Sequence, residues 1–173
     1  MHPTVPHEPR TIMQRTARIL IVLTLLTGAS TAQSDTMAPA PVFGRYRPAA
    51  DPHRQLKEAV AEAAGSRRIL LEVGGEWCIW CHRLDTLFLR NPDLTGYLKR
   101  HFVLVKINVS PENENKEFLK AYPKVPGYPH LFVLENDGRF LHSQDTGELE
   151  KGKGHDREKV MEFLRRWTLP RKE

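Results

Sequence analysis

The chain has only two cysteines, Cys78 and Cys81, and they lie three positions apart. They follow an apolar run, residues 69–73, and the pair Gly74-Gly75, which gives the backbone freedom to turn. We therefore expect a short strand, a turn and then a helix that begins at Cys78. Side chains at positions i and i+3 of the first helical turn share one face, so the two sulfurs can form a disulfide.

The expected helix start places Cys78 beside backbone N–H groups that lack partners, where the helix dipole favours negative charge. Cysteines in such positions can have a pKa lowered to roughly 3.5–7.5, which favours the thiolate that attacks disulfides. Cys78 is therefore the expected nucleophile. Cys81 lies one turn deeper in the helix and is the expected resolving thiol.

The same motif permits two other interpretations. Residues 78–82, Cys-Ile-Trp-Cys-His, also match C-x-x-C-H, the pattern for covalent attachment of c-type haem. Two cysteines can also form an inert cross-link or pack as small apolar residues. The motif by itself leaves a redox dithiol, a c-type haem protein and a structural pair open.

The N-terminus has the order of a secretory signal peptide. Arginines precede an apolar run, residues 19–26, and small residues follow it up to Ala32. A run this short cannot span a bilayer, so we expect no stable membrane anchor. We expect residues 1–32 to be a signal peptide that is cleaved after about Ala32, with Met13 as an alternative start. The mature protein would then be periplasmic or otherwise extracytoplasmic.

Composition fits one exported domain in which the two cysteines are the expected functional residues. The chain is 40% hydrophobic and 27% charged, which suits one globular domain plus a tail. Outside the cytosol disulfides persist, and a chain with two cysteines has none to spare for a second, structural bridge. The net charge of +5 comes without a basic run interleaved with aromatic residues, so we expect no nucleic-acid partner. We also expect no cofactor, no metal and a monomer.

The rest of the chain predicts a single folded domain after a tail. Residues 33–50 are rich in proline and predict a flexible lead-in without chemistry of its own, whereas residues 51–173 are the expected domain. A hairpin turn and alternating elements predict an α/β fold with a central mixed sheet flanked by helices. Helices are expected at 52–64, from 78 onward with a break at 91–92, at 116–122 and after 156; strands are expected at 69–73, 102–109, 130–134 and 139–142, with a loop before 156.

Three motifs together resemble the thioredoxin superfamily over roughly residues 51–169. They are Glu76-Trp77-Cys78-x-x-Cys81 after a strand, Val105-Lys106-Ile107-Asn108 at a strand end, and Val125-Pro126-Gly127-Tyr128-Pro129 before the hairpin. The resemblance implies a thioredoxin-like fold and a thiol–disulfide oxidoreductase. Within this superfamily, the chain is most similar to exported, periplasmic members that act on protein disulfides.

The resemblance also assigns roles to single residues. It implies that Cys78 is the nucleophile, Cys81 the resolving cysteine and Pro129 a cis-proline beside the dithiol. Glu72 and Lys106 are the single charges in two apolar strands. Glu72 lies where thioredoxins have a buried acid, and Lys106 lies where they have its partner, so we expect Glu72 to act as acid or base near Cys81.

Aromatic residues next to these positions are the expected substrate contacts, because aromatic side chains are common interface anchors. They are Trp77, Trp80 and Tyr128, together with Pro129. The expected partners are protein thiols and disulfides, and an unidentified redox partner that resets the dithiol. The resemblance favours reduction or isomerisation over oxidation. A non-catalytic binding module or chaperone on the same fold is the alternative, and a c-type haem protein is a more distant one.

Overall fold

A computed structural model describes residues 43–170. The expected signal peptide and the first part of the expected lead-in lie outside the described residues. The centre of the described part is a four-stranded sheet in the order β2-β1-β3-β4. β1 (Arg68–Gly74) pairs in parallel with β2 (Phe102–Asn108). On its other side, β1 pairs antiparallel with β3 (His130–Leu134), which pairs antiparallel with β4 (Phe140–Asp145). The expected mixed sheet is therefore confirmed.

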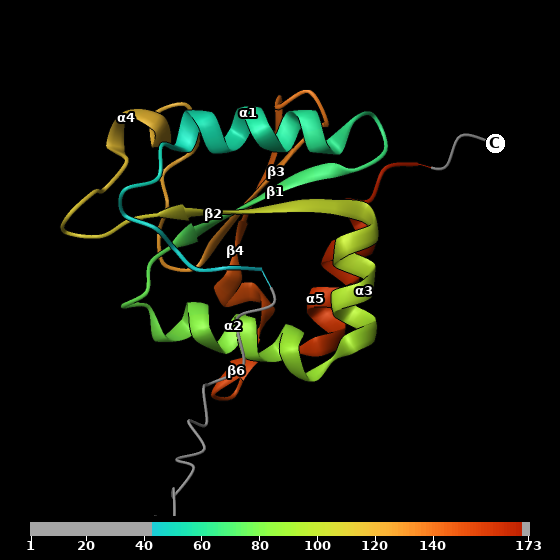
Figure 1. Ribbon diagram of the computed structural model, residues 1–173. Helices are drawn as coiled ribbons and strands as arrows, with labels where there is room; N and C mark the ends of the chain where they lie inside the picture. Colours follow the sequence, from blue (N-terminus) through green and yellow to red (C-terminus); the bar gives the residue numbers. More distant parts are fainter. Residues whose placement is uncertain (1–42, 171–173) are drawn as a thin grey trace, which may run out of the picture. The chain divides into compact units, whose positions relative to one another are not determined.

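Helices cover both faces of this sheet (Figure 1). One face carries α1 (Pro52–Ala63) and α4 (Lys116–Leu119), and the other carries α2 (Ile79–Arg90), α3 (Pro92–His101) and α5 (Arg157–Arg166). Side chains alternate between the faces, because Leu71 packs toward α1 and α4 whereas Leu70 packs toward α2, α3 and α5. No helix in the range 43–170 is long and apolar enough to cross a membrane.

Local signals place the helix boundaries where the sequence predicts them. The Asp51 side chain accepts a hydrogen bond from the His53 N–H at 2.9 Å and caps α1. Gly65 follows this helix with a φ of 76°, a conformation that glycine adopts without steric cost. Asn91 ends α2, and Pro92 begins α3, so the expected break is confirmed.

The expected helix at 116–122 is shorter than predicted. α4 ends at Leu119, and the N–H groups of Ala121 and Tyr122 then bond to carbonyls three residues back. This tighter turn leads directly into Pro123, which cannot continue a helix.

The expected loop before α5 contains regular structure. β4 extends to Asp145, and it is followed by a 3₁₀ turn, η1 (Thr146–Leu149), and a small hairpin of β5 (Glu150–Lys151) and β6 (Gly154–His155). The hairpin packs against α2. Strands of two residues are too short to produce an alternating pattern, so no periodicity predicts them.

Residues 43–50, at the end of the expected flexible lead-in, are docked on the domain. The Phe43 ring packs edge-to-face on Phe88 with 5.5 Å between centroids, and the Asn113 side chain donates to the Pro48 carbonyl at 2.8 Å. Tyr46 is only 3% exposed. The expected flexibility of the lead-in is wrong for residues 43–50. The sequence pattern did not indicate this docking, because the contacts are long-range and leave no local periodicity.

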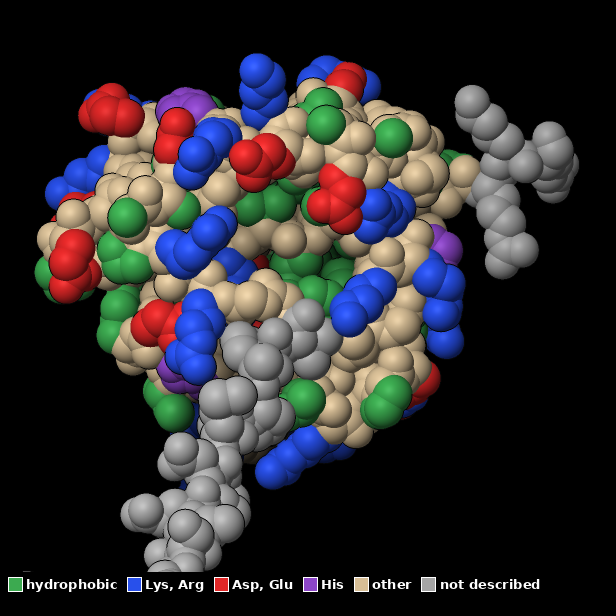
Figure 2. Space-filling view, viewed as in Figure 1, with side chains coloured by type: hydrophobic (Ala, Val, Ile, Leu, Met, Phe, Trp, Pro, Cys, Tyr) green, Lys and Arg blue, Asp and Glu red, His purple; other side chains and the backbone are tan. Residues whose placement is uncertain are grey.

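Charged side chains of both signs are spread over the surface. On the face shown in Figure 2, Lys and Arg side chains are interspersed with Asp and Glu side chains and do not gather in a single basic patch.

Candidate active site

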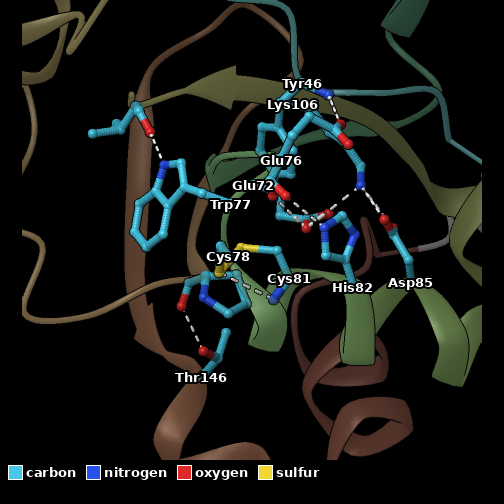
Figure 3. The surroundings of a disulfide bond; sticks show 12 residues. Tyr46, Glu72, Glu76, Trp77, Cys78, Cys81, His82, Asp85, Lys106 and Thr146 are labelled. Carbon is cyan, nitrogen blue, oxygen red and sulfur yellow. Dashed lines mark hydrogen bonds and ion pairs between the residues drawn. A yellow bond between two sulfur atoms is a disulfide. The ribbon is translucent and has the colours of Figure 1, made fainter. Parts of the chain in front are cut away.

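The two cysteines form a disulfide at the start of α2 (Figure 3). Their Cα atoms lie 5.2 Å apart. Cys78 is the N-cap residue of α2, and its Sγ accepts a hydrogen bond from the Cys81 N–H at 3.1 Å. When the disulfide is reduced, the same N–H group and the helix dipole stabilise negative charge on the Cys78 sulfur. The predicted position of the dithiol is confirmed.

In the strand before the motif, every second residue lies on the same face of the sheet. Leu70 packs in the core against α2, α3 and α5, and Glu72 and Gly74 follow at intervals of two. A Cβ added to Gly74 would lie 2.5 Å from Cys81 Sγ and 2.9 Å from the Tyr46 hydroxyl oxygen. Only glycine lets the sulfur and this hydroxyl approach the strand so closely.

Glu72 lies at the centre of the ionisable groups beside the disulfide. It is 0% exposed, and its Oε1 accepts a hydrogen bond from the Tyr46 hydroxyl at 2.6 Å. Burial raises the pKa of Glu72 from 4.5 to about 7, although Lys106 and the Tyr46 hydroxyl oppose the rise. Its Oε2 has no hydrogen-bond partner among the described residues. A carboxyl group that titrates near neutral pH can accept a proton from a nearby thiol.

Lys106 is the register neighbour of Glu72 in the parallel pair, and its Nζ lies 3.8 Å from Glu72 Oε1. Its hydrogen bonds, however, go to both carboxylate oxygens of Asp85, at 2.7 and 2.6 Å. Lys106 therefore lies beside Glu72, as expected, and also pairs with a second acid, Asp85. Sequence analysis missed Asp85, although its position four residues after Cys81 places both on one helix face.

Tyr46 is the second residue that the sequence analysis missed. Its backbone N–H donates to Glu76 Oε1 at 2.8 Å, and Glu76 also lies 3.7 Å from Arg45. The His82 Nε2 bonds to the Glu76 carbonyl oxygen at 2.7 Å. Glu76 thus holds Arg45 and Tyr46 against the turn before Cys78. The groups on this side of the disulfide, Tyr46, Glu72, Asp85 and Lys106, are called the inner cluster below.

Exposed apolar residues lie on the other side of the disulfide. Trp77 and Ile79 are 57% and 58% exposed. The Trp77 indole donates to the Val109 carbonyl at 2.6 Å, and its ring packs edge-to-face on Tyr128 with 5.5 Å between centroids. The peptide bond between Tyr128 and Pro129 is cis, as expected. Trp77, Ile79 and Tyr128 are called the outer surface below; Ile79 had not been predicted as part of it.

Trp80 occupies a different environment from Trp77. It is half-buried, and its ring lies 4.3 Å from the Arg83 guanidinium carbon and 5.6 Å from the His155 ring. The small β5–β6 hairpin therefore supports the dipeptide between the cysteines. Substrate contact by Trp77, Trp80, Tyr128 and Pro129 stays a prediction.

A disulfide at a helix N-terminus, together with a cis-proline and a buried acid on a mixed sheet, is the set of features expected for a thioredoxin-fold dithiol site. A family model described as thioredoxin-like matches residues 51–136. The solved structure of a disulphide isomerase from Xylella fastidiosa Temecula1 is 31% identical with a TM-score of 0.61, and the match covers 70% of this chain and 94% of that one. The chain belongs to the thioredoxin-like family, and it has the fold of that family with a Cys-x-x-Cys disulfide at the start of α2.

Two curated relatives match with lower identity. The disulfide bond reductase DsbH of Chlamydia pneumoniae is 27% identical over 42% of this chain and 48% of its own length. The thiol:disulfide interchange protein DsbD of a Pseudomonas strain is 28% identical over 85% of this chain and 26% of its own length. The chain thus spans about half of the first relative and about a quarter of the second.

Proposed function

We propose that the protein is a thiol–disulfide oxidoreductase of the cell envelope that reduces or isomerises disulfides in other proteins. The observation that carries this proposal is the Cys78–Cys81 disulfide at the start of α2, between an exposed apolar surface and a buried ionisable cluster. A partner can approach from the outer surface, and protons can be exchanged with the inner cluster.

The reaction begins from the reduced dithiol. The Cys78 thiolate attacks one sulfur of the partner's disulfide, a Cys78–partner disulfide forms, and the partner's other sulfur leaves and takes up a proton. The Glu72 carboxylate then accepts the proton of Cys81. The Cys81 thiolate attacks Cys78 Sγ and displaces the partner's remaining sulfur as a thiolate. The partner gains two electrons, and the protein ends as the disulfide.

Isomerisation uses the same first step. If a thiolate of the partner attacks the mixed disulfide before Cys81 does, a different disulfide forms in the partner and Cys78 is released reduced. Reduction or isomerisation is supported by the names of the similar proteins, a disulfide bond reductase and a disulphide isomerase. Repeated reduction requires a second redox partner that returns electrons to the dithiol.

A groove beside Trp77 is consistent with a substrate that is a polypeptide. It has a volume of about 880 Å³, and its apolar walls include Pro48, Val109 and Pro111. It borders the exposed indole, so a segment bound there lies within reach of the cysteines. We propose that the chain flanking the substrate's cysteine occupies this groove.

The cell-envelope location rests on the sequence pattern of residues 1–32. It is tested by mass spectrometry of the protein isolated from the envelope fraction. A mature N-terminus after about Ala32 supports export, and retention of the apolar run 19–26 contradicts cleavage.

The function is tested with insulin as substrate and with a Cys81→Ser variant in cells. Wild type should reduce insulin, and Cys81→Ser should accumulate mixed disulfides with envelope proteins because the resolving thiol is missing. Cys78→Ser is the matched control and should do neither. A protein that binds unfolded chains but neither reduces insulin nor forms mixed disulfides would instead be a binding module.

A further inference from the structure

We propose that Tyr46 is a positioning residue for the resolving step, because its hydroxyl group holds the Glu72 carboxylate in place beside Cys81. This role presupposes the oxidoreductase function proposed above. Tyr46 lies before residues 51–136, which match the family model, so the contact adds a residue to the site from outside that match.

Three contacts fix the Tyr46 side chain in the inner cluster. Its hydroxyl donates to Glu72 Oε1 at 2.6 Å, and the Lys106 Nζ lies 4.7 Å from its ring centroid. Its hydroxyl oxygen and Cys81 Sγ both border the space that a Cβ on Gly74 would fill. The tyrosine therefore covers the charged pair and reaches the resolving sulfur's immediate surroundings (Figure 3).

Within residues 43–170, the Tyr46 hydroxyl donates the only hydrogen bond to the Glu72 carboxylate, because Oε2 has no partner there. The other groups that act on this carboxylate are Lys106 from β2, and Asp85 and His82 from α2. Of these, Lys106 is 3.8 Å away and directs its hydrogen bonds to Asp85. Without the tyrosine hydroxyl, the buried carboxylate would lack any hydrogen bond from the described residues.

The hydroxyl acts as a donor and not as the proton acceptor. Burial and the neighbouring Glu72 raise the pKa of Tyr46 well above 10, so its proton stays in place at neutral pH. A hydrogen bond to a carboxylate favours the charged form and lowers its pKa. Tyr46 thus opposes the effect of burial on Glu72 and keeps a larger fraction of it ready to accept the Cys81 proton.

The resolving step is a proton transfer followed by thiol–disulfide exchange. Glu72 takes the proton from Cys81, the Cys81–Cys78 bond forms, the bond between Cys78 and the partner breaks, and the leaving thiolate carries the electron pair away. Tyr46 keeps its own proton throughout.

The test uses the reduced full-length protein and the aromatic disulfide DTNB, which releases one coloured thiolate when Cys78 attacks and a second when Cys81 resolves. Tyr46→Phe should slow the second release about fivefold at pH 7 and leave it unchanged near pH 9. The midpoint of its pH profile should rise by about one unit, because a hydrogen bond to the charged form is lost. The first release should keep its pH profile.

Tyr97→Phe is the matched control. It also removes one tyrosine hydroxyl that is hydrogen-bonded, to Thr168 Oγ1 at 3.0 Å, but neither residue belongs to the inner cluster. It should leave the midpoint of the second release unchanged. In a Glu72→Gln background, Tyr46→Phe should cause no further change in the pH profile.

Replacing Tyr46 with fluorotyrosine keeps the ring and strengthens the donor, so the midpoint should fall. This second substitution remains informative if the phenylalanine variant does not fold. An unchanged or lowered midpoint in a folded Tyr46→Phe variant, or an unchanged or raised one with fluorotyrosine, overturns the proposal. DTNB needs no protein substrate, so a wild type that resolves DTNB but fails to reduce insulin would contradict the proposed function and not the role of Tyr46.

Discussion

The two sides of the Cys78–Cys81 disulfide differ in exposure and in charge. On the outer surface, Trp77 and Ile79 are more than half exposed and uncharged. In the inner cluster, Glu72 and Lys106 are buried and ionisable. A single dithiol therefore borders two environments, one suited to contact with a partner and one suited to proton exchange.

The difference shows how a buried charge is tolerated beside a reactive group. Two oppositely charged side chains cost several kcal/mol to dehydrate unless their geometry and hydrogen bonds compensate. Lys106 meets this condition through Asp85, whereas Glu72 meets it only in part, through Tyr46 and a longer contact with Lys106. Incomplete compensation is what leaves the pKa of Glu72 near 7, where it can exchange protons.

The largest expected effect comes from removing the shared cation of the inner cluster. Lys106→Met should lower the free energy of unfolding by about 3–5 kcal/mol at pH 8, because it leaves Glu72 and Asp85 without their cation. The loss should be smaller at pH 5, where Glu72 is protonated. Chemical denaturation at both pH values measures it. Lys120→Met is the control, since Lys120 forms an exposed pair with Glu117 and should change stability by less than about 0.5 kcal/mol.

The next effect concerns the dependence of stability on pH. Folding raises the Glu72 pKa from 4.5 to about 7, so the stability gained by binding its proton is complete below pH 4.5 and is lost as pH rises through 7. Glu72→Gln removes this loss. Relative to wild type, its free energy of unfolding should therefore rise by about 3 kcal/mol between pH 4 and 8.

The same variant should slow the second DTNB release at pH 7 and leave the first unchanged, because only Cys81 depends on Glu72 as a base. Resolution rates that equal those of wild type across pH 6 to 8 would mean that Glu72 has a structural role only.

A smaller effect tests how closely the inner cluster is packed. Gly74→Ala places a methyl group 2.5 Å from Cys81 Sγ, so it should destabilise the protein by about 1–3 kcal/mol and slow the second DTNB release. Gly127→Ala is the control, because a Cβ there meets no atom within 4 Å and its φ is not positive. Equal thermal unfolding midpoints for the two variants would contradict the crowding at Gly74.

The smallest expected effect on stability lies on the outer surface. Ile79→Ser should change the free energy of unfolding by less than about 0.5 kcal/mol, because the side chain is 58% exposed. It should nevertheless lower kcat/KM for insulin severalfold while both DTNB phases stay as in wild type. Leu89→Ser changes an exposed residue at the far end of α2 and should leave insulin reduction unaffected. If both variants reduce insulin equally well, the outer surface has no part in substrate binding.

Much of the fold follows from local patterns. The apolar strand before Cys78, the cap at Asp51 and the break at Asn91-Pro92 each depend on residues that are neighbours in the chain. Such signals are short-range, and the structure confirms them. The β5–β6 hairpin was missed because its strands are too short for a period to appear.

The sequence by itself determined the dithiol, its place at a helix start, the cis-proline and the buried acid at Glu72. The dithiol and its place at a helix start follow from spacing within a few residues, whereas the cis-proline and the buried acid follow from the motifs that resemble the thioredoxin superfamily. Only the tertiary structure decided which groups surround the acid. Tyr46 reaches Glu72 across 26 positions of sequence, and Asp85 takes the hydrogen bonds of Lys106 across 21. Contacts at such separations depend on how strands and helices pack, and no local period or motif encodes that packing.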